Sequence, residues 1–456
     1  METGSLKKDS LSVLETVALS VAVMGPSASV SVIVILMAEI TVYSAPLVLF
    51  ISMLTVGLVA VSIIKLNQYF PSSGSVYGFA EKTLGRKAGF VAGWLIVFTY
   101  LILGTSCATI VGTYLQIVFG IFGANIHWEP IVLLELVLVR YLTGKDAKAN
   151  TRIMLLLEAV TMGILIVLSV FILTKAAGTA SLSAAPFMPG SNSLSAIAIA
   201  TVFGFLAFSG FEGASSLGEE SKNPRKTIPI AVASAVVISG IFYILVSYAQ
   251  VIGFGATPEG VKALVGSDAP MAELASRYMN NSYSIIILLC ISISFFSAVL
   301  GCVSAGARIL YTMGRDGLLS TRLGKTHRKY NTPYVGINIL TAVTALILIS
   351  CFSMEAIDVG RYAATIGTLA LILTYILATF CALVFFFRNN IWKGVKLIIP
   401  VMSIFLLGYI FYSNVYPVPN YPMNLFPYLV VVWIFVGIIL SFRINRTKFE
   451  NPHHHL

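Results

Sequence analysis

The sequence predicts an all-α integral membrane protein with about twelve transmembrane helices. Of its 456 residues, 57% are hydrophobic and only 11% are charged, whereas a soluble domain carries about 25% charged residues. The apolar residues form long continuous runs, and basic residues gather between alternate runs. This composition excludes a soluble multidomain protein, a disordered chain and a nucleic-acid-binding protein, although lysine and arginine outnumber aspartate and glutamate by 29 to 19.

Each predicted helix corresponds to one apolar run. A spanning helix needs about 20 mostly apolar residues, and runs without period-two alternation favour helices over the strands of a barrel. The fourth run is the shortest and contains Glu135. The runs cover residues 11–40, 43–66, 86–119, 128–142, 152–175, 194–217, 228–254, 283–312, 334–352, 357–387, 395–413 and 425–442.

The distribution of basic residues predicts the orientation of the chain. If the N-terminus is cytoplasmic, all but four of the 29 lysines and arginines fall on the cytoplasmic side. Such an excess is typical of cytoplasmic loops, so both termini are predicted to be cytoplasmic. The four exceptions are Lys175, Lys262, Arg277 and Arg361.

The first apolar run is interrupted near its middle. Gly25 and Pro26 are followed by three small residues, Ser27, Ala28 and Ser29, and proline removes a backbone donor while its ring clashes with the preceding turn. We expect the helix to unwind here, with a simple proline kink as the alternative. The start of the second half-helix would expose unpaired N–H groups, which suit a carboxylate.

The sixth run has a second interruption, where Gly210 and Gly213 flank Glu212. An unwound segment would expose the carbonyl groups of Phe208, Ser209 and Gly210, which suit an ammonium group. If the chain contains two inverted five-helix repeats, helices one and six are the equivalent first helices of the two repeats. Paired breaks in such equivalent helices indicate a substrate site at the bilayer midplane. The two breaks would together bind the zwitterionic head of an amino acid through the backbone.

The predicted repeats divide the chain into segments. No sequence identity between the two halves is visible, so the repeat follows from the topology alone. The segments are a cytoplasmic N-terminus (1–10), a first repeat (11–175), a second repeat (194–387), two further helices (395–442) and a cytoplasmic tail (443–456).

Several motifs follow one another in a consistent order. The strongest is FSGFE at 208–212 with EESKNPRKTIP at 219–229; others are FPSSGSVY at 70–77 and the stretch from Ala307-Arg308 to Leu319, with Thr332-Pro333 after it. Together they resemble the amino acid–polyamine–organocation (APC) superfamily of transporters, whose first-helix motif is usually Gly-Ser-Gly. The resemblance implies the LeuT-like fold and alternating access, in which helices 1, 2, 6 and 7 rock against helices 3, 4, 8 and 9.

The resemblance and the two predicted breaks together suggest a substrate site and a gate. Tyr100 and Gly104 resemble substrate-lining positions of the superfamily on helix three. A bulky apolar side chain can close a cavity from water, which makes Phe205 and Phe208 the gate candidates. The predicted substrate-binding residues are Met24, Gly25, Ser27, Ala28, Ser29, Tyr100, Gly104, Phe208, Ser209 and Gly210.

Candidates for ion coupling lie on helices five and six. Some members of the superfamily carry a lysine nine residues after an arginine on helix five; counted from Arg152, that position is Thr161. Glu158 lies three residues earlier on the same helical face, and an intramembrane carboxyl group is a functional candidate by default. Glu212 could take up a proton, meet a substrate ammonium group or brace the unwound backbone.

Other polar residues have weaker functional signals. Glu135 is predicted to be a satisfied structural residue. Ser294 and Ser297 could contribute to a sodium site, although serine in membrane helices more often bonds its own helix or a neighbour. The five cysteines lack metal-ligand spacing. We therefore predict no firm metal site, and no cofactor apart from a coupling proton or sodium ion.

The leading predicted function is secondary transport of an amino acid across the plasma membrane. A polyamine or organic cation carrier would favour more acidic residues around the cavity; an exchanger of the same superfamily and a membrane nutrient sensor are further alternatives. An enzyme is not predicted, because His127 and His327, the histidines outside the terminal tail, lie in loops. The predicted partners are a small-molecule substrate and the lipid bilayer, not nucleic acid.

Overall fold

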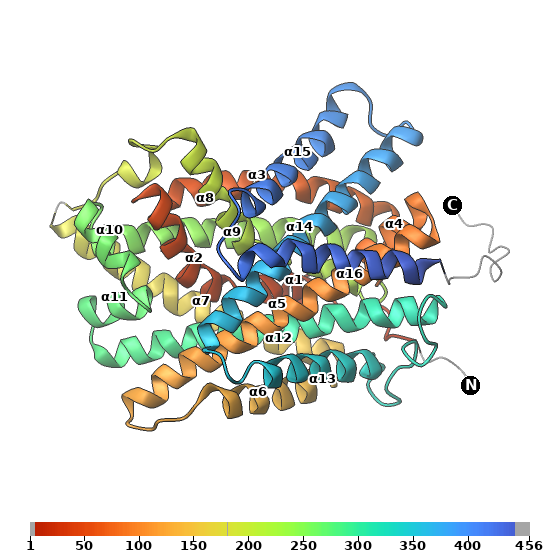
Figure 1. Ribbon diagram of the computed structural model, residues 1–456, viewed down its shortest axis with the longest axis horizontal. Helices are drawn as coiled ribbons and strands as arrows, with labels where there is room; N and C mark the ends of the chain where they lie inside the picture. The colour runs from red at the N-terminus through yellow and green to blue at the C-terminus, as the bar shows by residue number, and fades with distance from the viewer. Residues whose placement is uncertain (1–4, 180, 443–456) are drawn as a thin grey trace.

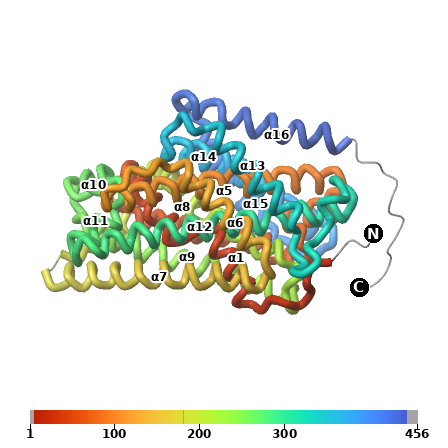
Figure 2. Tube along the Cα trace, turned by 90° about the horizontal axis from the view of Figure 1, so that it is seen from below, coloured from red at the N-terminus to blue at the C-terminus, as the bar shows by residue number. Residues whose placement is uncertain are grey.

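The computed structural model describes residues 5–179 and 181–442, which form an elongated bundle of helices (Figure 1). Within these residues the only β-structure is an isolated bridge between Leu11 and Ser221, so the predicted all-α class is confirmed. The described chain begins and ends at the same end of the bundle (Figures 1 and 2). The predicted tail, 443–456, lies outside the described residues.

Nine helical segments of the described chain are long and apolar enough to cross a membrane, as expected of a multi-pass membrane protein. The first segment, Val13–Thr41, is made of two helices separated by one residue. The nine comprise α1 (Val13–Met24) with α2 (Pro26–Thr41), α3 (Ala45–Tyr69), α5 (Arg86–Ile121), α7 (Ala147–Gly178), α9 (Pro224–Phe254), α12 (Asn281–Arg315), α14 (Ala356–Arg388), η3 (Gly394–Leu397) with α15 (Ile398–Val415), and η4 (Met423–Leu425) with α16 (Phe426–Ser441).

Three shorter helices occupy the other predicted runs, so the count of twelve spans stays a prediction. They are α6 (Trp128–Thr143), α8 (Leu194–Ala207) and α13 (Tyr334–Ser350). The connections contain short helices that the apolar runs did not predict: α4 (Val76–Leu84), η1 (Ala185–Phe187), α10 (Pro258–Val265) and α11 (Pro270–Tyr278). The short helix η2 (Gly213–Leu217) falls at the end of the sixth run.

The sixth predicted run, 194–217, is interrupted in the structure where the sequence predicts a break. Helix α8 ends at Ala207. The chain then passes through turns and the single 3₁₀ segment η2 before α9 begins at Pro224. Gly210 within these turns has φ +91°, a conformation that glycine adopts without steric cost.

The first span lies in the middle of the bundle. Helix α1 packs against α7, α9 and α12, and α2 packs against α8 and α12. Helix α5 packs along both α12 and α14 and also contacts α4, α6 and α16. Figure 1 shows α1 in the middle of the bundle and α15 at its edge, and Figure 2 shows α16 along the outer side. The break in the first span is therefore buried by protein.

Three glycines allow the backbone to approach Val23, the penultimate residue of α1. A β-carbon on Gly210 would lie 2.1 Å from Val23 Cγ1, and a β-carbon on Gly301 of α12 would lie 2.7 Å from Val23 Cγ2. At Gly213 the corresponding distance to Val23 Cγ2 is 3.2 Å. Because packed interiors leave no room for such overlaps, these glycines permit α1 to contact α12 and the segment after α8.

We expect Gly301→Ala to lower the free energy of unfolding by about 1–3 kcal/mol, because the added methyl group overpacks the contact with Val23. The measurement is the thermal unfolding midpoint of the purified protein in detergent. Gly163→Ala on α7 is the matched control, since its β-carbon would meet no atom within 4 Å. Equal midpoints for the two variants would contradict the close packing at Val23.

Candidate functional site

The first break lies at Gly25, between α1 and α2. Gly25 has φ +52°, and its amide donates to the carbonyls of Val21 (3.0 Å) and Ala22 (3.1 Å), which ends α1. Pro26 then begins α2, at a helix position where its missing N–H group would have no intrahelical partner. The interruption is thus a glycine cap followed by a new helix rather than a kink in one continuous helix.

Two of the amides predicted to bind a carboxylate already have partners within the protein. The Ala28 amide donates to Ser294 Oγ (3.2 Å), and the Ser29 amide donates to the Gly25 carbonyl (2.8 Å). Ser29 Oγ donates to the Met24 carbonyl (2.7 Å). A ligand carboxylate at this helix terminus would therefore have to replace or supplement these bonds.

The coupling candidates on α7 lie beside the start of α2. Ser294 Oγ donates to both carboxylate oxygens of Glu158, at 3.2 and 3.1 Å. Ser27 Oγ donates to Thr161 Oγ1 (3.1 Å), and Thr161 Oγ1 donates to the Glu158 carbonyl (3.2 Å). All four side chains are buried. The positive end of the α2 dipole favours a negative charge at this position.

The sodium candidates differ in their surroundings. Ser294 bridges Glu158 and α2 as described, whereas the buried Ser297 Oγ has no hydrogen-bond partner among the described residues. The described chain contains no cluster of three histidine, cysteine, aspartate or glutamate side chains that could hold a metal ion. A sodium site at these serines stays a prediction.

Glu212 anchors the second break to two helices. It accepts hydrogen bonds from the hydroxyl of Tyr100 on α5 (2.7 Å) and from the hydroxyl of Tyr375 on α14. Tyr375 also accepts a bond from the Gly210 amide (3.1 Å). The hydroxyl of Tyr100, a predicted substrate-lining residue, is therefore bonded to the protein, and Tyr375 is a site residue that the sequence analysis missed.

Other side chains satisfy the remaining backbone groups of the second break. The Tyr243 hydroxyl donates to the carbonyl of Ala207, the last residue of α8 (2.6 Å). Ser20 Oγ of α1 donates to the Phe211 carbonyl (2.7 Å) and accepts from the Ala214 amide (2.9 Å). The irregular segment is thus held by side chains of α1, α5, α9 and α14, as buried backbone groups require.

Ser209 retains hydrogen-bonding capacity at this break. The carbonyls of Phe208 and Gly210, which were predicted to face an ammonium group, accept turn hydrogen bonds from the amides of Phe211 (3.3 Å) and Gly213 (2.9 Å). By contrast, the buried Ser209 Oγ has no hydrogen-bond partner in the described part of the chain. Its hydroxyl could therefore contact a ligand between the breaks.

A cavity of about 110 Å³ lies between the two breaks. Of the predicted substrate-binding residues, Met24, Ser29 and Ser209 line it, while the other seven do not. No charged side chain lines the cavity. The lining residues are Val23, Met24, Ser29, Val32, Ile33, Leu103, Ser106, Cys107, Ile110, Leu206, Ser209, Phe295, Cys302 and Ala364.

The predicted gate residues pack behind this cavity. The ring of Phe208 contacts that of Tyr243 edge-on, with centroids 5.0 Å apart, and the ring of Phe205 contacts that of Tyr375 at 5.8 Å. Both phenylalanines are buried. Gly104 does not line the cavity but packs against α12, where a β-carbon would lie 3.3 Å from Cys302 Cβ. A gating function for the two phenylalanines stays a prediction.

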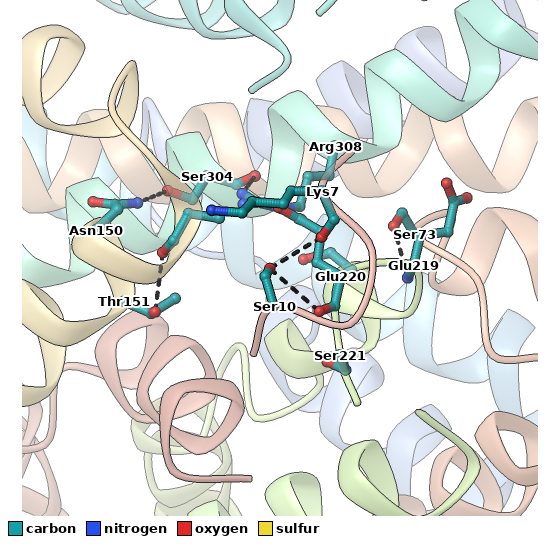
Figure 3. Close-up of polar contacts among 12 residues, drawn as sticks. Lys7, Ser10, Ser73, Asn150, Thr151, Glu219, Glu220, Ser221, Ser304 and Arg308 are labelled. Atoms are coloured by element: carbon teal, nitrogen blue, oxygen red, sulfur yellow. Dashed lines mark hydrogen bonds and ion pairs between the residues drawn. The ribbon is translucent and has the colours of Figure 1, made fainter. Parts of the chain in front are cut away.

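A buried ion pair joins two of the sequence motifs at the end of the bundle where the described chain begins. Arg308 Nε and Nη2 donate to the two carboxylate oxygens of Glu220, at 2.5 and 3.3 Å, and the side chains are only 4% and 1% exposed. Arg308 Nη1 donates to the Ser304 carbonyl (2.9 Å). Figure 3 shows Arg308 directly above Glu220. Both residues lie in the sequence motifs, 88 residues apart, and nothing in the motifs indicates that their opposite charges pair.

The third motif joins the same network. The Glu219 amide donates to Ser73 Oγ (3.3 Å), and Arg315 Nη1 donates to the Glu219 carboxylate (2.6 Å). The Tyr77 hydroxyl donates to Asp316 (2.9 Å). Burial and the neighbouring Asp316 carboxylate raise the pKa of Tyr77 well above its usual value, so this phenol stays a donor.

The N-terminal segment covers this network. The amides of Ser10 and Leu11 donate to the Glu220 carbonyl at 2.8 and 3.0 Å, and the Lys222 amide donates to the Leu11 carbonyl (2.8 Å). Figure 3 shows Lys7 and Ser10 lying against Glu220 and Ser221. The motif residues therefore bind one another and the N-terminal segment at one end of the bundle, and none of Ser73, Tyr77, Glu220 and Arg308 lines the cavity between the breaks.

The fold is one found among membrane transporters. A crystal structure of a mutant of the Eremococcus coleocola manganese transporter superposes with a TM-score of 0.59, covering 94% of this chain and 93% of that chain at 14% sequence identity. A likeness at this identity concerns the fold alone.

Residues 21–451 match the amino acid permease family, and the chain belongs to this family, whose members are transporters rather than enzymes. It is 27% identical to the low-affinity putrescine importer of Escherichia coli K12 over 63% of each chain. It is also 27% identical to a branched-chain amino acid permease of Bacillus subtilis over 68% of this chain and 67% of that one. A methylthioribose transporter of B. subtilis is 25% identical to this chain, over 86% of this chain and 84% of that one. The matched region spans less than two thirds of the putrescine importer.

We expect Arg308→Met to lower the free energy of unfolding by about 3–5 kcal/mol, because Glu220 would remain buried and unpaired. Replacing both residues, with Arg308→Met and Glu220→Leu together, should recover most of this loss. Thermal unfolding in detergent measures both effects. Arg315→Met is the matched control, since its pair with Glu219 is partly exposed and contributes at most about 1 kcal/mol. A double variant as unstable as the single one would contradict the prediction.

Proposed function

We propose that the protein is a secondary active transporter that moves amino acids across the plasma membrane by alternating access. The single observation that carries the proposal is the cavity between the two helix breaks, which has Ser29 on one side and the unpartnered hydroxyl of Ser209 on the other. In the proposal, the substrate carboxylate lies near the start of α2 and its ammonium group lies near Ser209. Amino acid permease membership supports the substrate class.

The cavity lining favours a neutral amino acid with an apolar side chain. Apart from its serines and cysteines the lining is apolar, with Val32, Ile33, Leu103, Ile110 and Phe295 among its members. Apolar walls bind an apolar side chain by excluding water. The volume of about 110 Å³, below the roughly 300–1,000 Å³ of drug-sized sites, favours a small substrate.

Putrescine or another polyamine is the second candidate, because a relative is a putrescine importer. A diamine carries two ammonium groups, and each loses its hydration on entering a buried cavity unless a carboxylate or several acceptors replace the water. No carboxylate lines this cavity. Glu158 and Glu212 behind the wall already accept hydrogen bonds from Ser294 and from two tyrosines. The geometry therefore favours an amino acid.

The packing of the helices supports two moving parts. Helix α9 contacts α1 and α3, and α3 contacts α8, while α5, α6, α12 and α13 all contact one another. These groups correspond to the rocking bundle and the scaffold that the resemblance implies, within twelve spans and two inverted repeats. With both termini cytoplasmic, the pair of Glu220 and Arg308 would close the cytoplasmic path, and its separation would open that path.

We expect purified protein in proteoliposomes to take up radiolabelled leucine, isoleucine or valine in preference to putrescine. We expect Gly210→Leu to abolish that uptake, because a β-carbon at this position overlaps Val23 and displaces the second break. The measurement is initial uptake into vesicles, with binding followed by scintillation proximity.

Gly408→Leu on α15 is the matched control, since a β-carbon there meets no atom within 4 Å, and it should transport normally. Detergent-extracted yield and size-exclusion profiles check that Gly210→Leu still inserts and folds. Putrescine uptake without amino acid uptake would replace the proposed substrate class by the second candidate. Binding without flux or counterflow would indicate a sensor and reject transport.

We propose that Glu158 carries a coupling proton, because it is a buried carboxyl group hydrogen-bonded to Ser294 beside the first break. We expect Glu158→Gln to remove the pH dependence of uptake while preserving the hydrogen-bonding shape of the site. The measurement is initial uptake between pH 5 and pH 8 in sodium-free and sodium-containing buffer. Glu129→Gln serves as the control, because Glu129 lies in the first turn of α6, on a different helix from Glu158. Unaltered pH dependence in the Glu158 variant would reject this function.

A further inference from the structure

A second hollow lies on the membrane-facing side of α5, α6 and α12, outside the cavity between the breaks. It has a volume of about 420 Å³ and is lined almost wholly by apolar side chains. Leu134 and Leu138 of α6 line it and are 71% and 46% exposed, as side chains facing lipid would be. We call this hollow the α6 groove. Its lining contains one ionisable residue, Glu135.

Glu135 has no hydrogen-bond partner in the described part of the chain. The residue is 6% exposed, and both carboxylate oxygens are buried and unpartnered. The prediction that Glu135 is a satisfied structural residue is therefore wrong. It lies near the middle of α6 (Trp128–Thr143), about 10 Å along the helix axis from either end, so it would lie within the hydrocarbon core if α6 is a span as the sequence predicts.

A molecule in the groove could supply the partner that the described residues do not. A buried carboxylate is costly without a counter-charge or hydrogen-bond donors, and an intramembrane carboxyl group is rarely retained without a partner. An ammonium group offers three donors together with the complementary charge. The apolar lining, including Leu289, Ile293 and Phe296 of α12, would solvate a hydrocarbon chain attached to it.

We propose that the α6 groove binds a lipophilic amine from the bilayer, with its ammonium group on Glu135 and its hydrocarbon part along α5 and α12. This site is separate from the cavity between the breaks, since the two share no lining residue. The two spaces are nevertheless adjacent. Ile110 of α5 and Phe295 of α12 line the cavity, and the residues that follow them, Val111 and Phe296, line the groove. An amine in the groove would therefore bind without competing with the substrate.

The test uses the full chain in phosphatidylcholine nanodiscs, with decylamine as the probe and decanol as its uncharged counterpart. Thermal unfolding midpoints are measured as a function of probe concentration to give apparent affinities. We expect decylamine to stabilise the protein, and Glu135→Gln to weaken its apparent affinity by at least about tenfold, which is about 1.4 kcal/mol. The response to decanol should change by less than about twofold.

Two further variants separate this site from general partitioning into the bilayer. Glu129→Gln is the matched control on the same helix, outside the groove, and should keep the decylamine response. Leu134→Trp fills the groove from an exposed position and should abolish the response without disturbing the core. The proposal fails if decylamine stabilises Glu135→Gln as strongly as the unaltered protein, or if the decanol response depends equally on Glu135. If Glu135→Gln does not fold, an unchanged decylamine affinity in Leu134→Trp overturns the proposal. None of these measurements requires transport.

Discussion

The contact of Val23 with three glycines is the constraint on which the rest of the site depends. It holds the last turn of α1 against α12 and against the irregular segment after α8, at distances that no other residue type would allow at Gly210 or Gly301. Val23 lies two residues before the first break, at Gly25, and Gly210 and Gly213 belong to the second. This crossing therefore brings the two helix breaks together, and Val23 itself lines the cavity beside them.

A break inside a membrane protein leaves backbone groups that lipid cannot satisfy, and the surrounding side chains supply the partners. Tyr243 bonds the last carbonyl of α8, Ser20 bonds both an amide and a carbonyl of the segment, and Tyr375 bonds the Gly210 amide. Glu212 ties Tyr375 to Tyr100. These bonds draw on four helices, so the geometry of the second break depends on how the bundle is arranged around it. A rocking motion of those helices would therefore change the ligand-binding groups directly.

The sequence predicted the parts of this site that depend on local chemistry. Gly25 next to Pro26 is sufficient to end one helix and begin another, and the apolar runs locate the long helices to within a few residues. What the sequence could not predict are pairings between residues far apart in the chain. Glu212 and Tyr375 are separated by 163 residues, and nothing around Tyr375 distinguishes it from other tyrosines in apolar runs. The same reason explains why the amide of Ala28, expected to be free, is bonded to Ser294.

The motifs that carry the family resemblance and the residues that line the cavity lie in different parts of the molecule. Arg308, Glu220 and Tyr77 belong to motifs and form the polar network at one end of the bundle, whereas the cavity is lined by residues outside those motifs except for Ser209. The network residues do not line the cavity, so the same network could serve carriers of different solutes. Substrate selectivity would then reside in the apolar faces of α2, α5 and α12. Since α5 and α12 also line the α6 groove, two of these three helices would lie between the substrate on one side and molecules dissolved in the bilayer on the other.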